Sequence, residues 1–234
     1  MSQSDSFIDE VSEEVRRDRL FAAFRRYGWI GAVIVVVLVG GAAWNEYRKA
    51  QNLAAAQQFG DGLLAALEEE APQERVTALD TITAPGPVGD ALRRMLQASE
   101  AATAGDTENA VALLSQVAAS AETPPIYRAL AEFRALVLQS DSLTPAERRT
   151  GFEAMTAPGA PLRVLAQEQI ALTYIEEGDR EAALALLWEL QQEAEASAGL
   201  RQRTSQLIVT LGGDRTATED AGEPGAETSD APAD

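Results

Sequence analysis

A run of nineteen residues without a charged side chain, residues 27–45 (YGWIGAVIVVVLVGGAAWN), constrains the N-terminal part of this chain most strongly. As an α-helix it would be roughly 28 Å long, close to the ~30 Å hydrocarbon thickness of a bilayer. Tyr27, Trp29, Trp44 and Tyr47 flank its apolar centre, and aromatic rings favour the headgroup region of a membrane. The run therefore predicts a transmembrane helix over residues 27–47.

Two other structures compete with a membrane span for this run. A buried core helix usually shows a polar face within two turns, and this run has none. A cleaved signal peptide would use small residues such as Gly41 and Ala43 before the cut, but it begins with a short basic region. The 26 residues before this run carry six acids, so the membrane anchor is the preferred interpretation.

The distribution of basic residues predicts the orientation of the span. Five arginines precede it, whereas only Arg48 and Lys49 follow it before Arg75. Cytoplasmic flanks carry the excess of Lys and Arg. We therefore expect a cytoplasmic leader over residues 1–26 and a C-terminal part on the other side of the membrane. In a bacterium this is a single-pass inner-membrane protein with a periplasmic domain over residues 48–211.

The two ends of the chain are polar. In the leader, apolar residues from Val11 to Phe24 alternate with acids and arginines, which is compatible with a short amphipathic helix on the cytoplasmic surface or with a partly disordered leader. Residues 212–234 consist mainly of Gly, Pro, Ala, Thr, Ser and acids. Such a segment buries too little apolar surface to fold, so we expect a disordered acidic tail.

Composition excludes several classes of function. The net charge is −18, and residues 1–49 carry seven acids and seven bases, so the exported part is strongly acidic and unsuited to nucleic acid. The chain has no Cys and no His, which removes thiol chemistry, the commonest general base and the commonest transition-metal ligand. We expect no enzyme, no cofactor, no metal and no small-molecule substrate.

The residues after the span favour helix, because Ala, Leu, Glu and Gln are abundant and no long alternating apolar pattern appears. Pro and Gly divide the sequence into pieces of twelve to twenty residues, and Gly199 is interpreted as the last of these helix breakers. The first helix is expected to continue directly from the membrane helix. We predict an all-α domain with helices at 48–69, 72–83, 88–103, 107–120, 125–139, 145–156, 162–177, 180–197 and 200–211.

An internal repeat relates two of these helices. Residues 105–114 (GDTENAVALL) and residues 178–187 (GDREAALALL) agree at seven of ten positions, with an offset of 73 residues. In each segment Gly suits a tight turn, Asp suits a helix N-cap and a small Ala allows close helix packing. The residues that define the repeat are Gly105, Asp106, Ala110, Leu114, Gly178, Asp179, Ala183 and Leu187.

This arrangement resembles degenerate tetratricopeptide repeats, with Ala98 and Ala171 at the small position of the first helix of each hairpin. The expected early aromatic residue of that helix is replaced by Arg94 and Gln167. The closing proline is replaced by glutamate in both repeats, and only Tyr174 matches a further position of the pattern. The resemblance implies a solenoid of α-hairpins, for which an ordinary helical bundle is the alternative.

No sequence motif for catalysis is present. The triplet 68–70 and the acids Glu193 and Glu195 lack the spacing of a calcium loop, and they are expected to be solvated. A solenoid instead offers the concave face formed by its first helices to a peptide or partner helix. Candidate residues for such a partner-binding face are Arg93, Arg94, Gln97, Arg128, Arg134, Gln167 and Gln169.

The order of these parts resembles the YfgM-like family, the ancillary subunit of the Sec translocon. The resemblance covers residues 14–211 and is carried by residues 25–28 (RRYG), Trp44, Tyr47, Arg48 and the two Gly-Asp hairpins. It implies a membrane-inserted scaffold with Sec translocon subunits, a periplasmic chaperone and exported clients as protein partners. It brings no catalytic residues, and the acidic tail after Gly212 departs from it. The alternative is an assembly factor for another envelope or division complex.

Overall fold

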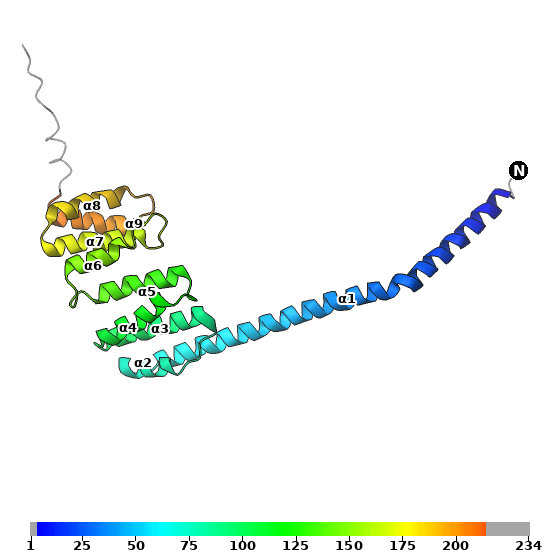
Figure 1. The fold of residues 1–234 in the computed structure, drawn as a ribbon, viewed down its shortest axis with the longest axis horizontal. Coiled ribbons are helices and arrows are strands. Elements are labelled where there is room, and N and C mark those ends of the chain that lie inside the picture. Colours follow the sequence, from blue (N-terminus) through cyan, green and yellow to red (C-terminus); the bar gives the residue numbers. More distant parts are fainter. Residues whose placement is uncertain (1–3, 214–234) are drawn as a thin grey trace, which may run out of the picture. The chain divides into compact units, whose positions relative to one another are not determined.

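The computed structural model describes residues 4–213, apart from the side chains of residues 4–24, 27, 28 and 32. Residues 214–234, which make up most of the tail predicted over 212–234, lie outside the described residues. The chain divides into two compact units, Met1–Gly60 and Asp61–Asp234, which are considered separately below. Every regular element in the described part is an α-helix (Figure 1), as expected for an all-α chain.

Nine helices span residues 4–213, and their ends follow the Pro and Gly positions closely. They are α1 (Ser4–Leu67), α2 (Pro72–Asp80), α3 (Gly86–Thr103), α4 (Thr107–Ala119), α5 (Pro125–Leu138), α6 (Pro145–Glu153), α7 (Arg163–Glu177), α8 (Arg180–Gln192) and α9 (Ala198–Thr210). The helices predicted beyond residue 71 agree within three residues at each end, with one exception. That exception is the end of the helix predicted over 180–197.

The helix predicted over 180–197 ends early, at Gln192, because the chain turns before the expected break at Gly199. Glu193 already has an extended backbone with ψ 125°. The Ser197 hydroxyl accepts a hydrogen bond from the Leu200 amide at 3.2 Å and thereby caps α9. Gly199 lies in the first turn of α9, so its interpretation as a helix breaker was wrong.

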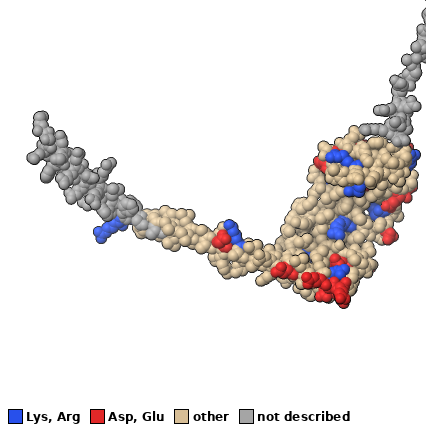
Figure 2. Space-filling model, turned by 180° about the vertical axis from the view of Figure 1, so that it is seen from behind, with Lys and Arg blue, Asp and Glu red and all other residues tan. Residues whose placement is uncertain are grey.

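Helix α1 is continuous through the charge-free run, as predicted. One helix in the described part, over Trp29–Leu67, is long and apolar enough to cross a membrane. The described apolar residues of the run are exposed, including Val36 and Leu38. Figure 2 shows a stretch of this helix without coloured charges between two groups of charged side chains.

The second unit is a solenoid in which each helix packs chiefly on its neighbours in sequence, with α2 on α3, α3 on α4, α4 on α5, α6 on α7, α7 on α8 and α8 on α9. Turns of a few residues force neighbouring helices to run antiparallel, which produces successive α-hairpins. Helices α3, α5, α7 and α9 therefore occupy equivalent positions along the solenoid (Figure 1).

The solenoid contains two related halves, residues 72–138 and 145–211, offset by 73 residues. Helices α2 to α5 in the first half correspond to α6 to α9 in the second. The left-handed glycines recur at the same offset: Gly86 and Gly159 have φ 83° and 79°, and Gly105 and Gly178 have φ 82° and 80°. The sequences 72–86 (PQERVTALDTITAPG) and 145–159 (PAERRTGFEAMTAPG) agree at eight of fifteen positions, so the repeat is longer than the ten-residue match first indicated.

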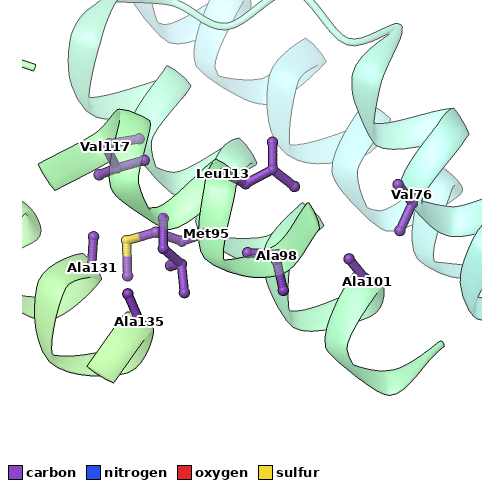
Figure 3. Close-up of a cluster of buried hydrophobic side chains, with 11 residues drawn as sticks. Val76, Met95, Ala98, Ala101, Leu113, Val117, Ala131 and Ala135 are labelled. Atoms are coloured by element: carbon purple, nitrogen blue, oxygen red, sulfur yellow. The ribbon is translucent and has the colours of Figure 1, made fainter. Parts of the chain in front are cut away.

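The core follows the same division. One buried cluster lies between α2, α3, α4 and α5 and includes Met95, Ala131 and Ala135 (Figure 3). A second cluster, with Leu187 and Leu190, joins α7, α8 and α9. A third is centred on buried Phe152 and receives side chains from α5, α6, α7 and α8. This third cluster joins the two halves into one continuous core.

Helix α9 takes the place that α5 has in the first half, but its outer face differs. Helix α5 packs on the Phe152 cluster through Ala129, Phe133 and Leu136. The equivalent residues of α9 are Gln202, Gln206 and Val209, all exposed. No further helix follows α9 within residues 4–213. The two glutamines allow this face to remain in contact with water.

Candidate functional site

The two Gly-Asp turns that defined the sequence repeat have the same geometry. The amide of Asp106 donates to the Ala101 carbonyl at 2.9 Å, and the amide of Asp179 donates to the Tyr174 carbonyl at 2.9 Å. A left-handed glycine with such a bond closes a helix C-terminus. Each Asp carboxylate also accepts from the third residue of the next helix, at 3.2 Å and 3.0 Å.

The small and apolar residues of the repeat lie between the paired helices. Ala110, Ala183 and Leu187 are completely buried, and Leu114 is 1% exposed. The small positions of the first helices, Ala98 and Ala171, are equally buried. Side chains of this size allow two helices to approach closely, so these residues establish the hairpins rather than a binding surface.

A groove of about 640 Å³ lies on the face formed by α5, α7 and α9. Four apolar side chains line it: Phe133 from α5, Leu165 and Leu172 from α7, and Leu207 from α9. Gln169, Gln206 and Thr210 add uncharged polar groups. Helices α5 and α7 are the first helices of successive hairpins and α9 occupies the equivalent place, so the groove lies on the side of a solenoid that usually receives a partner.

One ion pair spans the groove between α7 and α9. The Arg203 Nε donates to Glu168 Oε1 at 2.8 Å, and its Nη2 donates to Glu168 Oε2 at 2.7 Å. The Glu168 side chain is only 8% exposed, whereas that of Arg203 is 53% exposed. The hydrogen bond that Arg203 donates to Glu168 raises the pKa of Arg203 above its usual value. These two residues are the only charged side chains among those that line the groove.

Gln97 was predicted on a partner-binding face, and the structure contradicts this. Its side chain is buried, and its Nε2 donates to the Val76 carbonyl at 3.1 Å. Arg93 is buried beside it and donates to Asp90 Oδ1 at 3.0 Å. Both side chains satisfy polar groups between α2 and α3 and are unavailable to a partner.

Of the other residues predicted on the partner-binding face, only Gln169 lines the groove. Arg94 is half-buried and binds Asp90 Oδ2 at 2.7 Å as well as the Gln116 side chain. Arg128 Nε and Gln167 Oε1 are buried atoms without a hydrogen-bond partner. Arg134 donates to Ser99 Oγ at 3.4 Å.

The apolar groove residues were missed because the predicted partner-binding face was drawn from Arg and Gln residues alone. On α7, Val164 and Ala171 form the buried stripe, while Leu165 and Leu172 form a second stripe one residue further along. Two leucines seven residues apart lie on the same helix face. A second apolar stripe on a helix that already has a core face is therefore the signal that identifies this groove.

The acidic residues 68–70 lie in the α1–α2 connection and are exposed. Figure 2 shows acidic side chains gathered at one end of the solenoid. The carbonyls of Glu69 and Glu70 accept hydrogen bonds from Arg75 Nη1 at 2.9 Å and 3.1 Å. Among the described residues, no group of three or more acidic side chains is arranged to hold a metal ion.

The model of the tetratricopeptide repeat-like domain family matches residues 22–147, just over half of the chain. The chain belongs to this family. The matched segment includes the whole charge-free run as well as helices α2 to α5. Tetratricopeptide-like repeats typically form protein-interaction scaffolds without catalytic activity, which agrees with the predicted class of function.

Comparison with characterised proteins adds little to this assignment. No curated protein matches the chain. A crystal structure described as a putative kinesin light chain with nearly identical tetratricopeptide-like repeats, from Podosopora anserina, has 18% sequence identity and a TM-score of 0.46. The match covers 74% of this chain and 89% of the other.

Proposed function

We propose that the protein is a membrane-anchored scaffold whose solenoid binds other proteins near the Sec translocon. In this role it assists the chaperone-linked handling of exported proteins on the periplasmic side of the bacterial inner membrane. The observation that carries the proposal is the combination, in one chain, of an apolar helix whose described residues are exposed and a tetratricopeptide-like solenoid with an open groove.

The anchor is supported by the exposure of the charge-free run. The apolar window within Trp29–Leu67 buries none of its residues in the protein. A helix that is apolar on all sides needs an apolar environment, and a bilayer supplies one. The five arginines before the run support a cytoplasmic N-terminus and, with it, a periplasmic location of residues 48–211.

The scaffold role is supported by the groove on α5, α7 and α9. It is open, lined largely by apolar and amide groups, and free of His and Cys, since the chain contains neither. Concave faces of helical solenoids commonly receive extended or helical segments of a partner. The association with the translocon itself is supported by the order of parts shared with the YfgM-like family.

Topology is tested by treating spheroplasts with an external protease. We expect cleavage within residues 48–213, with residues 1–26 protected. Extraction of membranes at alkaline pH should leave the chain in the membrane fraction. Protection of the solenoid from external protease, or release of the chain at alkaline pH, would contradict the proposed anchor and orientation.

Partners are tested by photocrosslinking in intact membranes. A photoreactive residue is introduced at the exposed positions Leu165 and Gln206 in the groove and, as a control, at exposed Glu108 on α4. Crosslinks to a translocon or chaperone component would support the proposal. Recovery of components from a different envelope or division complex would favour the alternative scaffold.

A further inference from the structure

We infer that the groove on α5, α7 and α9 binds uncharged, apolar polypeptide segments and rejects acidic ones, and that the Glu168–Arg203 pair sets this preference. The inference rests on the proposed function as a protein-binding scaffold and names the chemistry of the segment that is bound. It follows from the groove lining, the geometry of the ion pair and the charge of the chain.

The lining has apolar and neutral polar character. Phe133, Leu165, Leu172 and Leu207 offer apolar surface that gains from contact with apolar side chains of a ligand. Gln169 and Gln206 both donate and accept hydrogen bonds, so they suit the amide groups of a polypeptide backbone. A segment with apolar side chains and a free backbone edge therefore satisfies both parts of the lining.

The single cation of the lining is already engaged. Arg203 places two of its nitrogens on the two oxygens of Glu168, at 2.8 Å and 2.7 Å, in the paired geometry that a ligand carboxylate would also need. Glu168 is almost completely buried, so it requires this cation as its own partner. A carboxylate on a ligand would have to displace Glu168 and leave it buried without a counterion.

The charge of the whole chain acts in the same direction. The net charge is −18, and the whole excess of acidic over basic residues lies beyond residue 49. A surface with this excess of acids repels an approaching acidic segment at long range, especially at low ionic strength. Neutral segments experience no such repulsion.

The first half of the solenoid shows that the ion pair is a distinct feature of the second. The residues 73 positions before Glu168 and Arg203 are Met95 and Leu130, both part of the first apolar cluster. The first half therefore has apolar residues at both positions where the second half has the charged pair. Close packing between the helices does not require charges at these positions, so the pair in the groove can serve ligand selection.

The test uses the full-length chain in detergent micelles and two fluorescent peptides of twelve residues. One peptide contains only Leu, Ala and Gln and has blocked ends. The other carries three Glu in place of Leu and a free C-terminal carboxylate. Fluorescence anisotropy measures binding of both peptides to the wild type, Glu168→Gln and Glu177→Gln. Glu177 pairs with Arg149 outside the groove, so its substitution is a control with the same change in net charge.

The wild type is expected to bind the neutral peptide roughly tenfold more tightly than the acidic one, because the acidic peptide has fewer leucines to pack in the groove and its carboxylates are repelled by the acidic chain and find no free cation there. Glu168→Gln frees Arg203 and is expected to tighten binding of the acidic peptide roughly tenfold, with little change for the neutral one. Glu177→Gln should change neither. Leu172→Glu, which keeps the ion pair, should weaken binding of the neutral peptide.

Three results would overturn the inference: equal affinity of the wild type for both peptides, an equal gain in Glu177→Gln and Glu168→Gln, or no binding of either peptide. Far-ultraviolet circular dichroism confirms that each variant is folded before binding is interpreted. Photocrosslinking from a position outside the groove could identify protein partners while neither peptide binds. That result would support the scaffold function and contradict the assignment of the groove as the binding site.

Discussion

The two halves of the solenoid have the same backbone arrangement but differ in the side chains at corresponding positions of their first helices. Residues 72–138 and 145–211 have the same helix order and the same left-handed glycines at Gly105 and Gly178. Their corresponding packing positions hold Met95 and Leu130 in one half and Glu168 and Arg203 in the other. Turn geometry and small buried residues therefore determine the fold, while positions on the first helices are free to acquire different binding properties.

The largest expected difference between the halves concerns the equivalent buried anchors Phe152 and Leu79, both 0% exposed. Phe152→Ala should lower the free energy of unfolding by about 3–5 kcal/mol and Leu79→Ala by about 2–4 kcal/mol, because each leaves a cavity. The Phe152 ring also packs against the Phe133 ring in a tilted arrangement, with ring centroids 5.6 Å apart, so its loss weakens the junction of the halves.

Urea unfolding of the full-length chain in micelles measures both effects, and amide hydrogen exchange locates them. Phe152→Ala should increase exchange in α5, α6 and α7, whereas Leu79→Ala should increase it mainly in α2 and α3. Equal increases throughout the solenoid for both variants would show that the halves unfold as one unit. That result would remove the distinction between the two halves in stability.

The second prediction replaces the ion pair of the second half by the apolar residues found at the equivalent positions of the first half. Arg203→Leu alone leaves the buried Glu168 carboxylate without its cation and should cost about 2–3 kcal/mol, less than a fully buried pair because Arg203 is half exposed. Adding Glu168→Met, which reproduces Met95 and Leu130, should restore most of this loss. Urea unfolding of the two variants measures the coupling, and a double variant less stable than the single one would contradict the proposed equivalence.

The third prediction concerns the shared turns. Gly105→Ala and Gly178→Ala should each cost about 1–2 kcal/mol, because both glycines have left-handed φ and an added Cβ meets no atom within 4 Å. The cost is thus conformational and should be the same in both halves. Thermal and urea unfolding check this, with Gly41→Ala in the straight part of α1 as a control expected to have no effect on the solenoid. Costs that differ by more than about 1 kcal/mol would indicate that one turn is coupled to its surroundings.

The smallest expected effect is the response to acid, with one carboxylate in each half. Burial alone would raise the pKa of Asp90, but hydrogen bonds from Arg94 and Arg93 outweigh it and hold this pKa below its usual value. The hydrogen bond from Arg163 lowers the pKa of Glu193. A carboxylate with a lowered pKa in the folded state stabilises the fold above its unfolded pKa, at about 4, and this contribution is lost as the pH falls.

Stability should therefore decrease below about pH 4, and the Asp90→Asn and Glu193→Gln variants should each show a shallower decrease than the wild type. Urea unfolding between pH 3 and pH 6 checks this, since those values bracket the unfolded carboxyl pKa. A decrease of unchanged slope in both variants would show that other carboxylates govern the acid response.

Much of the fold could be predicted from the sequence because its boundaries depend on local chemistry. Pro at the first turn of α2, α5 and α6, and Gly-Asp before α4 and α8, marked those helices correctly. The end of α8 was misplaced because the Ser197 cap competes with the more obvious Gly199. The wider repeat could also have been predicted from the sequence, because residues 72–86 and 145–159 agree at eight of fifteen positions.

The groove was harder to predict than the helices. Its lining combines Phe133, Leu172 and Leu207, which are separated by 35 residues or more and come together only through stacking of hairpins. Gln97 shows the opposite error, because a polar side chain on a first helix was taken for surface. Its amide instead satisfies the Val76 carbonyl inside the core. Polar character alone therefore does not distinguish a binding face from an internal hydrogen bond.

The glutamines on the outer face of α9 determine how such a chain could change in length. An additional 73-residue period added after α9 would have to pack on Gln202 and Gln206, which lack the apolar contact that Phe133 supplies in α5. The same period inserted between α5 and α6 would meet the surfaces that already accept each other. Lengthening of this architecture is therefore easier by internal duplication between α5 and α6 than by addition after α9.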